Sequence, residues 1–294
     1  MIEFLSAFRA EFTWVFWFGV VAFGLIVGSF INVVIHRLPI MMMQGWQREC
    51  AELLQCPDKA PTESDRYDLV KPRSACPGCG RMIKAWENIP VISFLLLRAR
   101  CPGCGMRISL RYPLVEILVA VLTTGVILAF GLSLHSLAML PLVWALVAMS
   151  FIDLEHQLLP DQLTLPLLWL GLVISLHPSA PLDPGQAVIG AAVGYLSLWS
   201  VYHLFRLLTG KEGMGYGDFK LMGLLGAWMG WTVIPLVVLL GSGLGVLAAI
   251  GMALAGRTVR DRPMPFGPYL AGAGLVALLW GDAIISGYLR FSGI

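Results

Sequence analysis

An aspartate stands in a glycine-rich stretch, GMGYGDFK at residues 213–220, where a strongly apolar segment begins. An ionisable side chain at the edge of a lipid bilayer is costly, so Asp218 marks a candidate functional site. Non-helical backbone survives at membrane depth only inside protein or beside a water-filled cavity. Glycines without side chains would also let a peptide substrate approach the acid closely. The alternative is a polar loop that ends in an N-capping Asp218.

A catalytic acid of this kind needs a partner, and Asp153 supplies one. It stands in SFIDLEH, residues 150–156, where another apolar segment ends. Two close carboxylates cannot both ionise cheaply, so one holds a proton while the other is anionic. The anionic acid can deprotonate a water that attacks a peptide carbonyl, and the protonated acid can donate to the carbonyl oxygen. Asp161 is the rival partner, but capping of the helix that follows explains it at least as well.

The composition of the chain places these acids in a membrane protein. Hydrophobic residues make up 57% of the sequence, charged residues make up 13%, and the mean hydropathy is +0.78. A soluble domain carries about 25% charged residues. Several apolar runs reach the roughly 20 residues that a spanning helix needs. We therefore expect a polytopic membrane protein in contact with lipid, and the net charge of +2 gives no reason to expect a nucleic-acid partner.

The apolar runs predict about eight transmembrane helices, with a polar region after the first. The sixth span is short, and merging it with the seventh would reverse the orientation of everything after it. The expected spans are 14–35, 113–130, 137–152, 163–176, 187–208, 219–231, 233–254 and 269–285.

Lysine and arginine residues test that layout. The polar region, residues 36–112, holds twelve of the twenty basic residues, and eight spans place six more on the same side. Only Arg9 and Arg290 lie opposite. Since positive residues stay inside, we expect a cytoplasmic loop and both termini on the outer side. The strong asymmetry favours keeping the sixth and seventh spans separate.

The polar region contains two matched CPGCG motifs, at residues 76–80 and 101–105. Each Cys-Pro-Gly-Cys turn can present two thiolates to one tetrahedral Zn²⁺. Disulfides are disfavoured on the reducing side of the membrane, and redox sites rarely occur as two matched motifs. Four thiolates would close the coordination shell, which indicates a structural rather than a catalytic metal. The expected ligands are Cys76, Cys79, Cys101 and Cys104.

Taken together, the motifs resemble those of the bacterial type IV prepilin peptidases, a family of GxGD aspartyl proteases that are also N-methyltransferases. The resemblance extends over nearly the whole chain. Its motifs are GSFINVVIHRLP at 28–39, both cysteine motifs, WENIP at 86–90, RYPLVE at 111–116, Asp153 with His156, LPD at 159–161, GYGD at 215–218 with Lys220, and PFGP at 265–268.

The resemblance implies two activities and a location in the bacterial inner membrane. The catalytic pair of the family falls on Asp153 and Asp218. Family members cleave the leader of type IV prepilins and type II secretion pseudopilins after a glycine, at the cytoplasmic membrane face. They then methylate the new amino terminus, usually phenylalanine, with S-adenosylmethionine as the donor. The substrates carry an N-terminal leader and a hydrophobic helix, and both termini of the enzyme are expected in the periplasm.

The resulting fold class is an all-α polytopic membrane protein with a small cytoplasmic zinc-binding module inserted after the first helix. We expect a first transmembrane helix in residues 1–35, a four-cysteine zinc module in 36–112 and a transmembrane aspartyl protease core in 113–294. The binding site of the methyl donor stays unassigned, because the sequence has no Gly-rich strand-to-helix fingerprint. The polar loop of about 75 residues is also too short for a nucleotide-binding domain of usual size.

Two other classes of function compete with this interpretation. In a transporter, Asp153 and Asp218 would bind coupling cations, and an inverted repeat would be expected, but we find none in the sequence. In a structural component of a secretion machine, the cysteine module would be a docking site and the two acids would have no role.

Two further polar residues, Asn32 and Glu116, stand near the first loop. Asn32 is expected to make a hydrogen bond between helices. Glu116 lies just inside the second span, where it either pairs with Arg111 or helps to bind a cationic amine.

Overall fold

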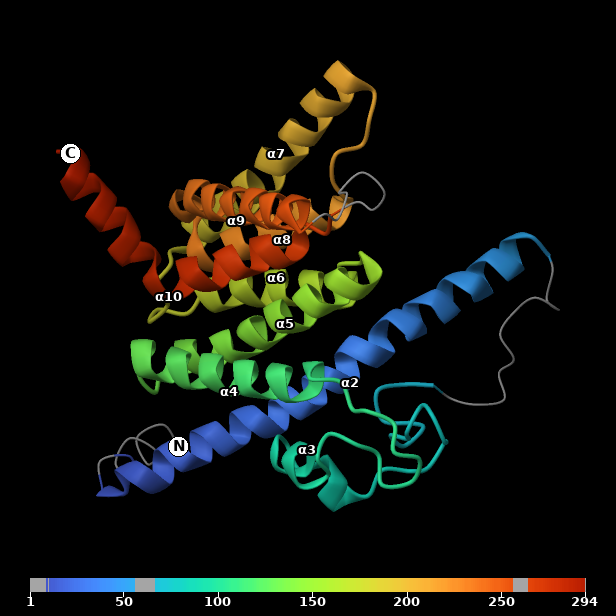
Figure 1. Ribbon diagram of the computed structural model, residues 1–294. Coiled ribbons are helices and arrows are strands. Elements are labelled where there is room, and N and C mark those ends of the chain that lie inside the picture. Colours follow the sequence, from blue (N-terminus) through green and yellow to red (C-terminus); the bar gives the residue numbers. More distant parts are fainter. Residues whose placement is uncertain (1–8, 10, 56–66, 256–263, 294) are drawn as a thin grey trace. The chain divides into compact units, whose positions relative to one another are not determined.

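The computed structural model describes residues 9, 11–55, 67–255 and 264–293, and this part of the chain is almost entirely helical (Figure 1). Three short elements join the long helices: η2 (Ala85–Asn88), α3 (Ile92–Leu96) and η3 (Trp231–Val233). The long helices are α2 (Thr13–Leu53), α4 (Arg111–Phe130), α5 (Leu134–His156), α6 (Asp161–Ser175), α7 (Pro184–Thr209), α8 (Tyr216–Met229), α9 (Ile234–Leu254) and α10 (Gly267–Ser292).

The all-α polytopic class is confirmed, because each of the eight expected spans corresponds to one of these helices. In the described ranges, six are long and apolar enough to cross a membrane. Helices α6 and α8 have 15 and 14 residues. At 1.5 Å per residue they reach roughly 22 and 21 Å, less than the ~30 Å of a hydrocarbon core. Helices α8 and α9 are separate, as expected, because the chain breaks at Gly230, whose φ is 79°.

The chain forms two compact units, Met1–Leu132 and Ser133–Ile294. In the first unit α2 packs along α4 (blue and green in Figure 1). A Cβ at Gly28 would lie 2.6 Å from the Cα of Glu116, so the helices need a small residue to approach this closely. The side chain of Asn32 donates to the carbonyl of Tyr112 at 3.0 Å, which confirms the expected bond between helices.

The helices and compact units of the structure follow other boundaries than the membrane segments expected from the sequence. Helix α2 does not end at Ile35 but continues to Leu53 with Pro39 inside it. The residues beyond Pro39 are rich in Met, Gln, Glu and Arg, which are good helix formers, so the helix persists after the apolar run ends. Helix α4 packs on α2 and belongs to the first compact unit, although we expected the core to begin at residue 113.

Helix α8 is the central helix of the second unit and packs against α6, α7 and α10. Nearly every residue from Asp218 to Trp228 is buried, so neighbouring helices cover the backbone of this short helix. Close crossings with α7 occur at Gly190 and Gly226, where each glycine would place a Cβ against the carbonyl oxygen of the other. Small residues at helix crossings are typical of packing in membranes.

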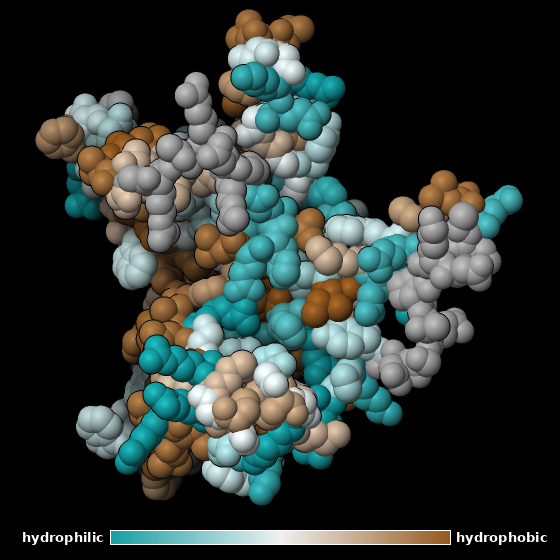
Figure 2. All heavy atoms as spheres, turned by 45° about the vertical axis from the view of Figure 1, so that its right-hand side comes forward, coloured by the Kyte–Doolittle hydropathy of each residue, from teal (hydrophilic) through white to brown (hydrophobic). Residues whose placement is uncertain are grey.

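Large hydrophobic side chains remain exposed on the outer sides of the helices, for example Phe18, Val121 and Leu239. Figure 2 shows hydrophobic areas on one face of the molecule, interrupted by hydrophilic residues. A lipid environment would cover such surfaces, which agrees with a polytopic membrane protein.

Candidate functional site

The second unit brings the two predicted acids together. Asp153 lies in the last turn of α5, Asp218 lies in the first turn of α8, and both carboxylates are buried. Their exposed fractions are 6% and 5%. The charge of Asp153 acts on Asp218, so the two acids are electrostatic neighbours from different helices. This is the arrangement that water activation by an acid pair requires.

Each carboxylate is held by the backbone N–H of a glycine. Gly267, the first residue of α10, donates to Oδ2 of Asp153 at 2.9 Å. Gly215 donates to Oδ2 of Asp218 at 3.2 Å. The second bond is the contact that an acid three residues after the N-cap makes, so Asp218 also stabilises the start of α8. Asp218 therefore stabilises a helix start, as the alternative explanation expects. It does so from the third helical position, however, and the N-cap residue is Gly215.

The side chain of Leu159 packs beside both Gly217, the neighbour of Asp218, and Gly267, which binds Asp153. A Cβ at Gly217, next to Asp218, would be 2.7 Å from the Cβ of Leu159. A Cβ at Gly267, which binds Asp153, would be 3.1 Å from Cδ2 of the same leucine. Apolar cover at this point lowers the local dielectric and strengthens interactions between the charged groups. In the sequence, Leu159 stands out only as part of the LPD motif at residues 159–161.

The rival acid, Asp161, makes a different contact. Both of its carboxylate oxygens accept from Nζ of Lys220, at 2.8 and 2.7 Å. Asp161 is the first residue of α6, and the N-cap is Pro160, so the expected capping role is wrong. The ion pair joins α6 to α8 with both side chains partly exposed. Pairs of this kind contribute about 0–1 kcal/mol to stability.

The first unit brings all four predicted cysteine ligands together. The Sγ atoms of Cys76, Cys79, Cys101 and Cys104 lie within 4.8 Å of one another. The Sγ atoms of Cys76 and Cys104 are 3.8 Å apart. Tetrahedral Zn²⁺ with bonds of about 2.3 Å places its sulfur ligands ~3.8 Å apart, so this cluster fits a metal ion of that geometry.

The two cysteine motifs fold into matching turns. In each, the first cysteine donates its N–H to a residue five positions later, as Cys76 does to Arg81 at 2.9 Å. In each, the glycine after the second cysteine has a positive φ, 68° at Gly80 and 72° at Gly105. A residue with a side chain rarely adopts such a φ. Backbone N–H groups of Cys104 and Gly103 lower the pKa of the Cys101 thiol to about 6. Thiolates are the form that binds metal.

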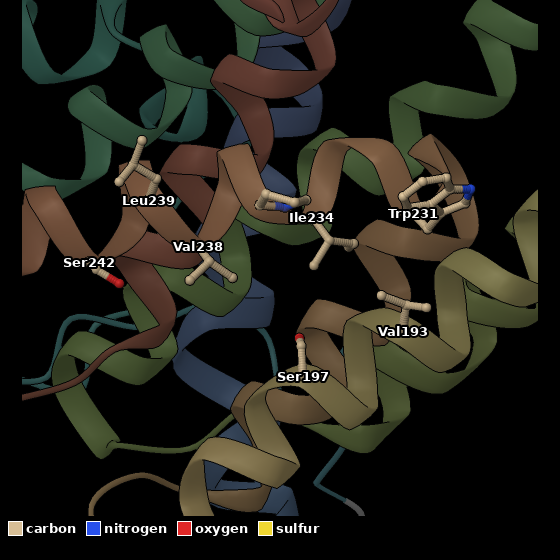
Figure 3. Close-up of a pocket in the computed structure, with 8 residues that line it drawn as sticks. Val193, Ser197, Trp231, Ile234, Val238, Leu239 and Ser242 are labelled. Carbon is tan, nitrogen blue, oxygen red and sulfur yellow. The ribbon is translucent and has the colours of Figure 1, made fainter.

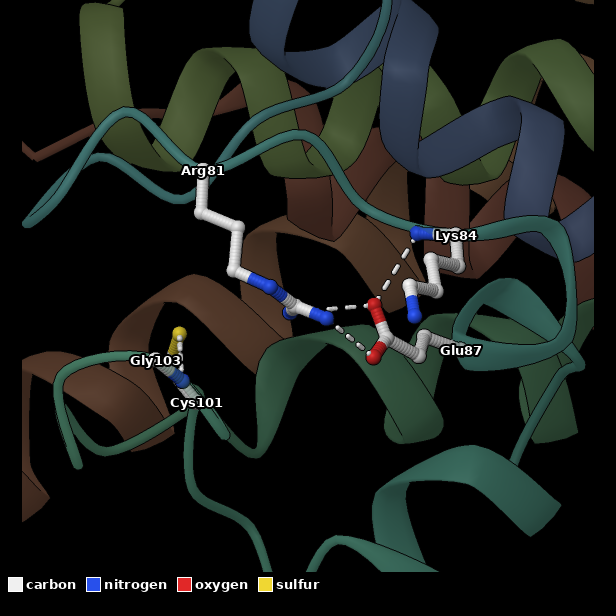
Figure 4. A network of polar contacts seen from close by, with 5 residues as sticks. All are labelled: Arg81, Lys84, Glu87, Cys101 and Gly103. Atoms are coloured by element: carbon white, nitrogen blue, oxygen red, sulfur yellow. Dashed lines mark hydrogen bonds and ion pairs between the residues drawn. The ribbon is translucent and has the colours of Figure 1, made fainter.

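A buried carboxylate ties the WENIP motif to the cysteine turns (Figure 4). Glu87 accepts from Nη2 and Nη1 of Arg81 at 2.7 and 3.2 Å, and from the N–H of Lys84 at 2.9 Å. The Arg81 guanidinium holds the pKa of Glu87 below its usual range. A Cβ at Gly103 would come within 3.1 Å of the Arg81 side chain, so this arginine also contacts the second cysteine motif. In the sequence, Glu87 stands out only as part of the WENIP motif, and nothing there indicates its contact with Arg81.

Glu116 is buried. It was expected either to pair with Arg111 or to help to bind a cationic amine, and the structure shows a further partner. Its Oε2 accepts the backbone N–H of Val91 at 2.8 Å. Val91 has φ 58° and ψ −47°, a region that β-branched residues rarely enter. The carboxylate thus connects α4 to the segment just before α3.

An apolar groove of about 490 Å³ lies between α7, η3 and α9 (Figure 3). Val193 and Ser197 line it from α7, and Trp231 lines it from η3. Its lining contains no ionisable residue. The groove therefore cannot supply acid–base chemistry, unlike the site at Asp153 and Asp218.

The fold and these sites define a class: a polytopic helical membrane protein with a buried aspartate pair and a four-cysteine cluster that could hold a metal ion. The chain belongs to the type IV leader peptidase family. The sequence model of the bacterial peptidase A24 N-terminal domain matches residues 22–130, and that of the type IV leader peptidase family matches residues 140–250. The two matches meet near the division between the compact units, Leu132 and Ser133.

Full-length relatives agree with the family models. Proteins named prepilin leader peptidase/N-methyltransferase from Stutzerimonas stutzeri and Pseudomonas aeruginosa are 54% and 52% identical over 92% of both chains. One with the same name from Aeromonas salmonicida is 53% identical over 94% of both chains. No solved structure matches the chain. The expected family resemblance is confirmed.

Proposed function

We propose that this protein is a membrane aspartic endopeptidase and N-methyltransferase acting on prepilins and pseudopilins. It removes the N-terminal leader and then methylates the new amino terminus, with S-adenosylmethionine as the donor. Membership of the family and the names of its relatives support both activities. The observation that carries the peptidase is the buried pair of Asp153 and Asp218 on two different helices.

In the proposed mechanism the acid pair holds one proton, because burial and proximity make two negative charges costly. The anionic carboxylate takes a proton from water, which attacks the scissile carbonyl. The protonated carboxylate donates its proton to the carbonyl oxygen, which gives a diol intermediate. The carboxylate that took the proton from water then passes it to the leaving amine, and collapse of the diol returns a proton to the other carboxylate. Glycine N–H groups bind Oδ2 of Asp153 and of Asp218. Oδ1 of each acid is then the atom that would face water and substrate.

The cysteine cluster is proposed to hold one structural zinc ion. Four thiolate ligands would leave no open position for substrate, so the metal would stabilise the module and not take part in cleavage. The ligands would be Cys76, Cys79, Cys101 and Cys104.

The proposed location is the bacterial inner membrane, with the cysteine module in the cytoplasm and both termini in the periplasm. The asymmetry of lysine and arginine supports this orientation. The acids then lie near the cytoplasmic face, at the end of α5 and the start of α8. A substrate with a cytoplasmic leader and a hydrophobic helix would present its cleavage site at that depth.

Incubation with a prepilin-like peptide tests the proposal. The purified protein in detergent is mixed with a peptide that carries a leader, a glycine–phenylalanine junction and an apolar segment. Mass spectrometry should show leader loss and, with S-adenosylmethionine present, a gain of one methyl group on the new amine. The Asp218→Asn variant is the control for contaminating peptidases. Intact peptide with the unmodified protein, or equal cleavage by the variant, would refute the proposed peptidase.

A further inference from the structure

The short helix α3 presents apolar side chains to the outside of the first unit. Ile92, Leu95 and Leu96 are spaced so that they share one helical face, and their exposed fractions are 54%, 68% and 70%. Trp86 is half exposed on η2, which contacts α3, and Ile89 is exposed between them. We call these five residues the α3 patch. Exposed apolar residues grouped in this way mark an interaction surface.

Strained backbone on both sides of α3 holds the patch outward. Val91 has φ 58°, and Arg98 and Ala99 have φ 49° and 56°. Non-glycine residues in this region are strained, and such strain persists only where the surroundings enforce it. Here the enforcing contacts are Glu116 with Val91 at 2.8 Å and the N–H of Ile108 with the carbonyl of Ala99 at 2.8 Å. The exposed position of α3 is therefore built into the fold.

The contact between Val91 and Glu116 sets the depth of α3 relative to the bilayer. Helix α4 has 20 residues, so its length of roughly 30 Å just matches the hydrocarbon core. Glu116 comes five positions after Arg111, the first residue of α4, and so lies about 7.5 Å inside the end of the helix. A segment bonded to Glu116 therefore runs within about 7.5 Å of the boundary between headgroups and acyl chains. Interfacial helices bury their apolar faces at this depth.

The charges around the patch complement anionic lipid. Residues 67–110 contain seven Lys or Arg and two Asp or Glu, a difference of five positive charges. Of the two acids, Glu87 is buried and paired with Arg81. Arg98, Arg100 and Arg107 are exposed after the apolar face of α3. Basic residues close to a bilayer that contains anionic lipid are attracted to its negative surface potential.

We infer that the α3 patch inserts into the interface of the membrane leaflet at which α4 begins, and that the neighbouring arginines bind its anionic phospholipid headgroups. Membrane insertion explains why an apolar helix is held outward by strained backbone beside a spanning helix. The cysteine module is then a membrane-attached module and not a freely exposed loop.

The same geometry identifies a control position that should stay out of the lipid. Asn32 of α2 lies level with Tyr112, at the end of α4. Arg37 lies five positions further along α2, about 7.5 Å farther from the bilayer centre, and donates to the carbonyl of Asp68 at 2.8 Å. Val70, two residues after Asp68, is 77% exposed. It is apolar and as exposed as Leu95, but it belongs to the segment held away from the membrane.

Photo-crosslinking to lipid tests the inference. The full chain is reconstituted in nanodiscs with p-benzoylphenylalanine at Leu95, at Leu96 or at Val70, and adducts are identified by mass spectrometry after illumination. Comparable thermal unfolding of the three variants shows that each is folded. In phosphatidylcholine with phosphatidylglycerol, phospholipid adducts should form severalfold more at positions 95 and 96 than at position 70. Equal yields at all three positions, no lipid adduct at 95 and 96, or adducts there with a second protein chain would overturn the inference.

A second comparison tests the role of charge. Arg98→Gln/Arg100→Gln is combined with the photoreactive group at Leu95. The yield of phosphatidylglycerol adducts should fall toward the yield that the unsubstituted arginines give in nanodiscs of phosphatidylcholine alone. An unchanged yield in the double variant would refute headgroup binding by these arginines.

Discussion

Asp153 accepts a hydrogen bond from the backbone N–H of Gly267 at 2.9 Å, across 114 positions of sequence. The bond joins the end of α5 to the start of α10. A Cβ at position 267 would lie 2.6 Å from the same oxygen of Asp153. The absence of a side chain at residue 267 therefore allows the acid to take this position.

Gly267→Ala is expected to lower leader cleavage by about 10²-fold, because displacement of a catalytic group by about 1 Å can have an effect of this size. The measurement is kcat/KM for a leader-bearing peptide. Gly272→Ala in the same helix is the matched control, since a Cβ there meets no atom within 4 Å. If Gly267→Ala cleaves as well as Gly272→Ala, the contact with Asp153 does not govern catalysis.

Asp153→Asn and Asp218→Asn are each expected to reduce cleavage by at least about 10²–10⁴-fold, the usual contribution of general acid–base catalysis. Each variant lacks either the proton acceptor or the proton donor. Asp161→Asn is the control, because its ion pair with Lys220 is partly exposed and its loss changes stability by at most about 1 kcal/mol. Near-normal turnover by Asp153→Asn, or an inactive Asp161→Asn, would show that the pair is wrongly assigned.

The cysteine cluster is expected to bind one zinc ion per chain. Elemental analysis of Cys76→Ser/Cys101→Ser should show that the metal is lost, because only two of the four thiolates remain. The module should also become more sensitive to protease, since metal binding and folding are linked in small zinc modules. Cys50→Ser, at an exposed thiol outside the cluster, should keep its zinc. Full zinc content in the double variant would contradict the assignment.

Sequence reasoning found the features that depend on local pattern. Apolar runs located all eight long helices, and the glycine-rich stretch and the paired motifs located Asp218 and the four cysteines. These signals work because the cost of a buried charge, or the geometry of a metal ligand, restricts which residues a short segment can contain.

The features that it missed depend on contacts between distant segments. Nothing near Gly267 in the sequence indicates that it binds Asp153, and nothing near Glu116 indicates a bond to Val91. The end of α2 could not be predicted for another reason. Hydropathy shows where a helix leaves the lipid, whereas propensity and packing decide where the helix itself ends, at Leu53.

We propose that the methyl-donor site involves the cysteine module. The two activities are then expected to be separable, because the acids belong to one compact unit and the cysteine module belongs to the other. Asp218→Asn should therefore still methylate a peptide supplied already cleaved. The attacking amine must be deprotonated, and its ordinary pKa is about 7.7–8.0, so methyl transfer should rise as the pH increases through that range. The assay uses pre-cleaved peptide and labelled S-adenosylmethionine.

The converse variant is Glu87→Gln, which weakens the bond between the WENIP motif and Arg81 and leaves the acid pair unchanged. It should impair methyl transfer more than cleavage, because the proposed donor site depends on the cysteine module and cleavage does not. Zinc content and thermal unfolding of both variants distinguish a specific effect from loss of folding. If Asp218→Asn is folded and holds its metal but transfers no methyl group to the pre-cleaved peptide, both reactions use one site and the separation is wrong.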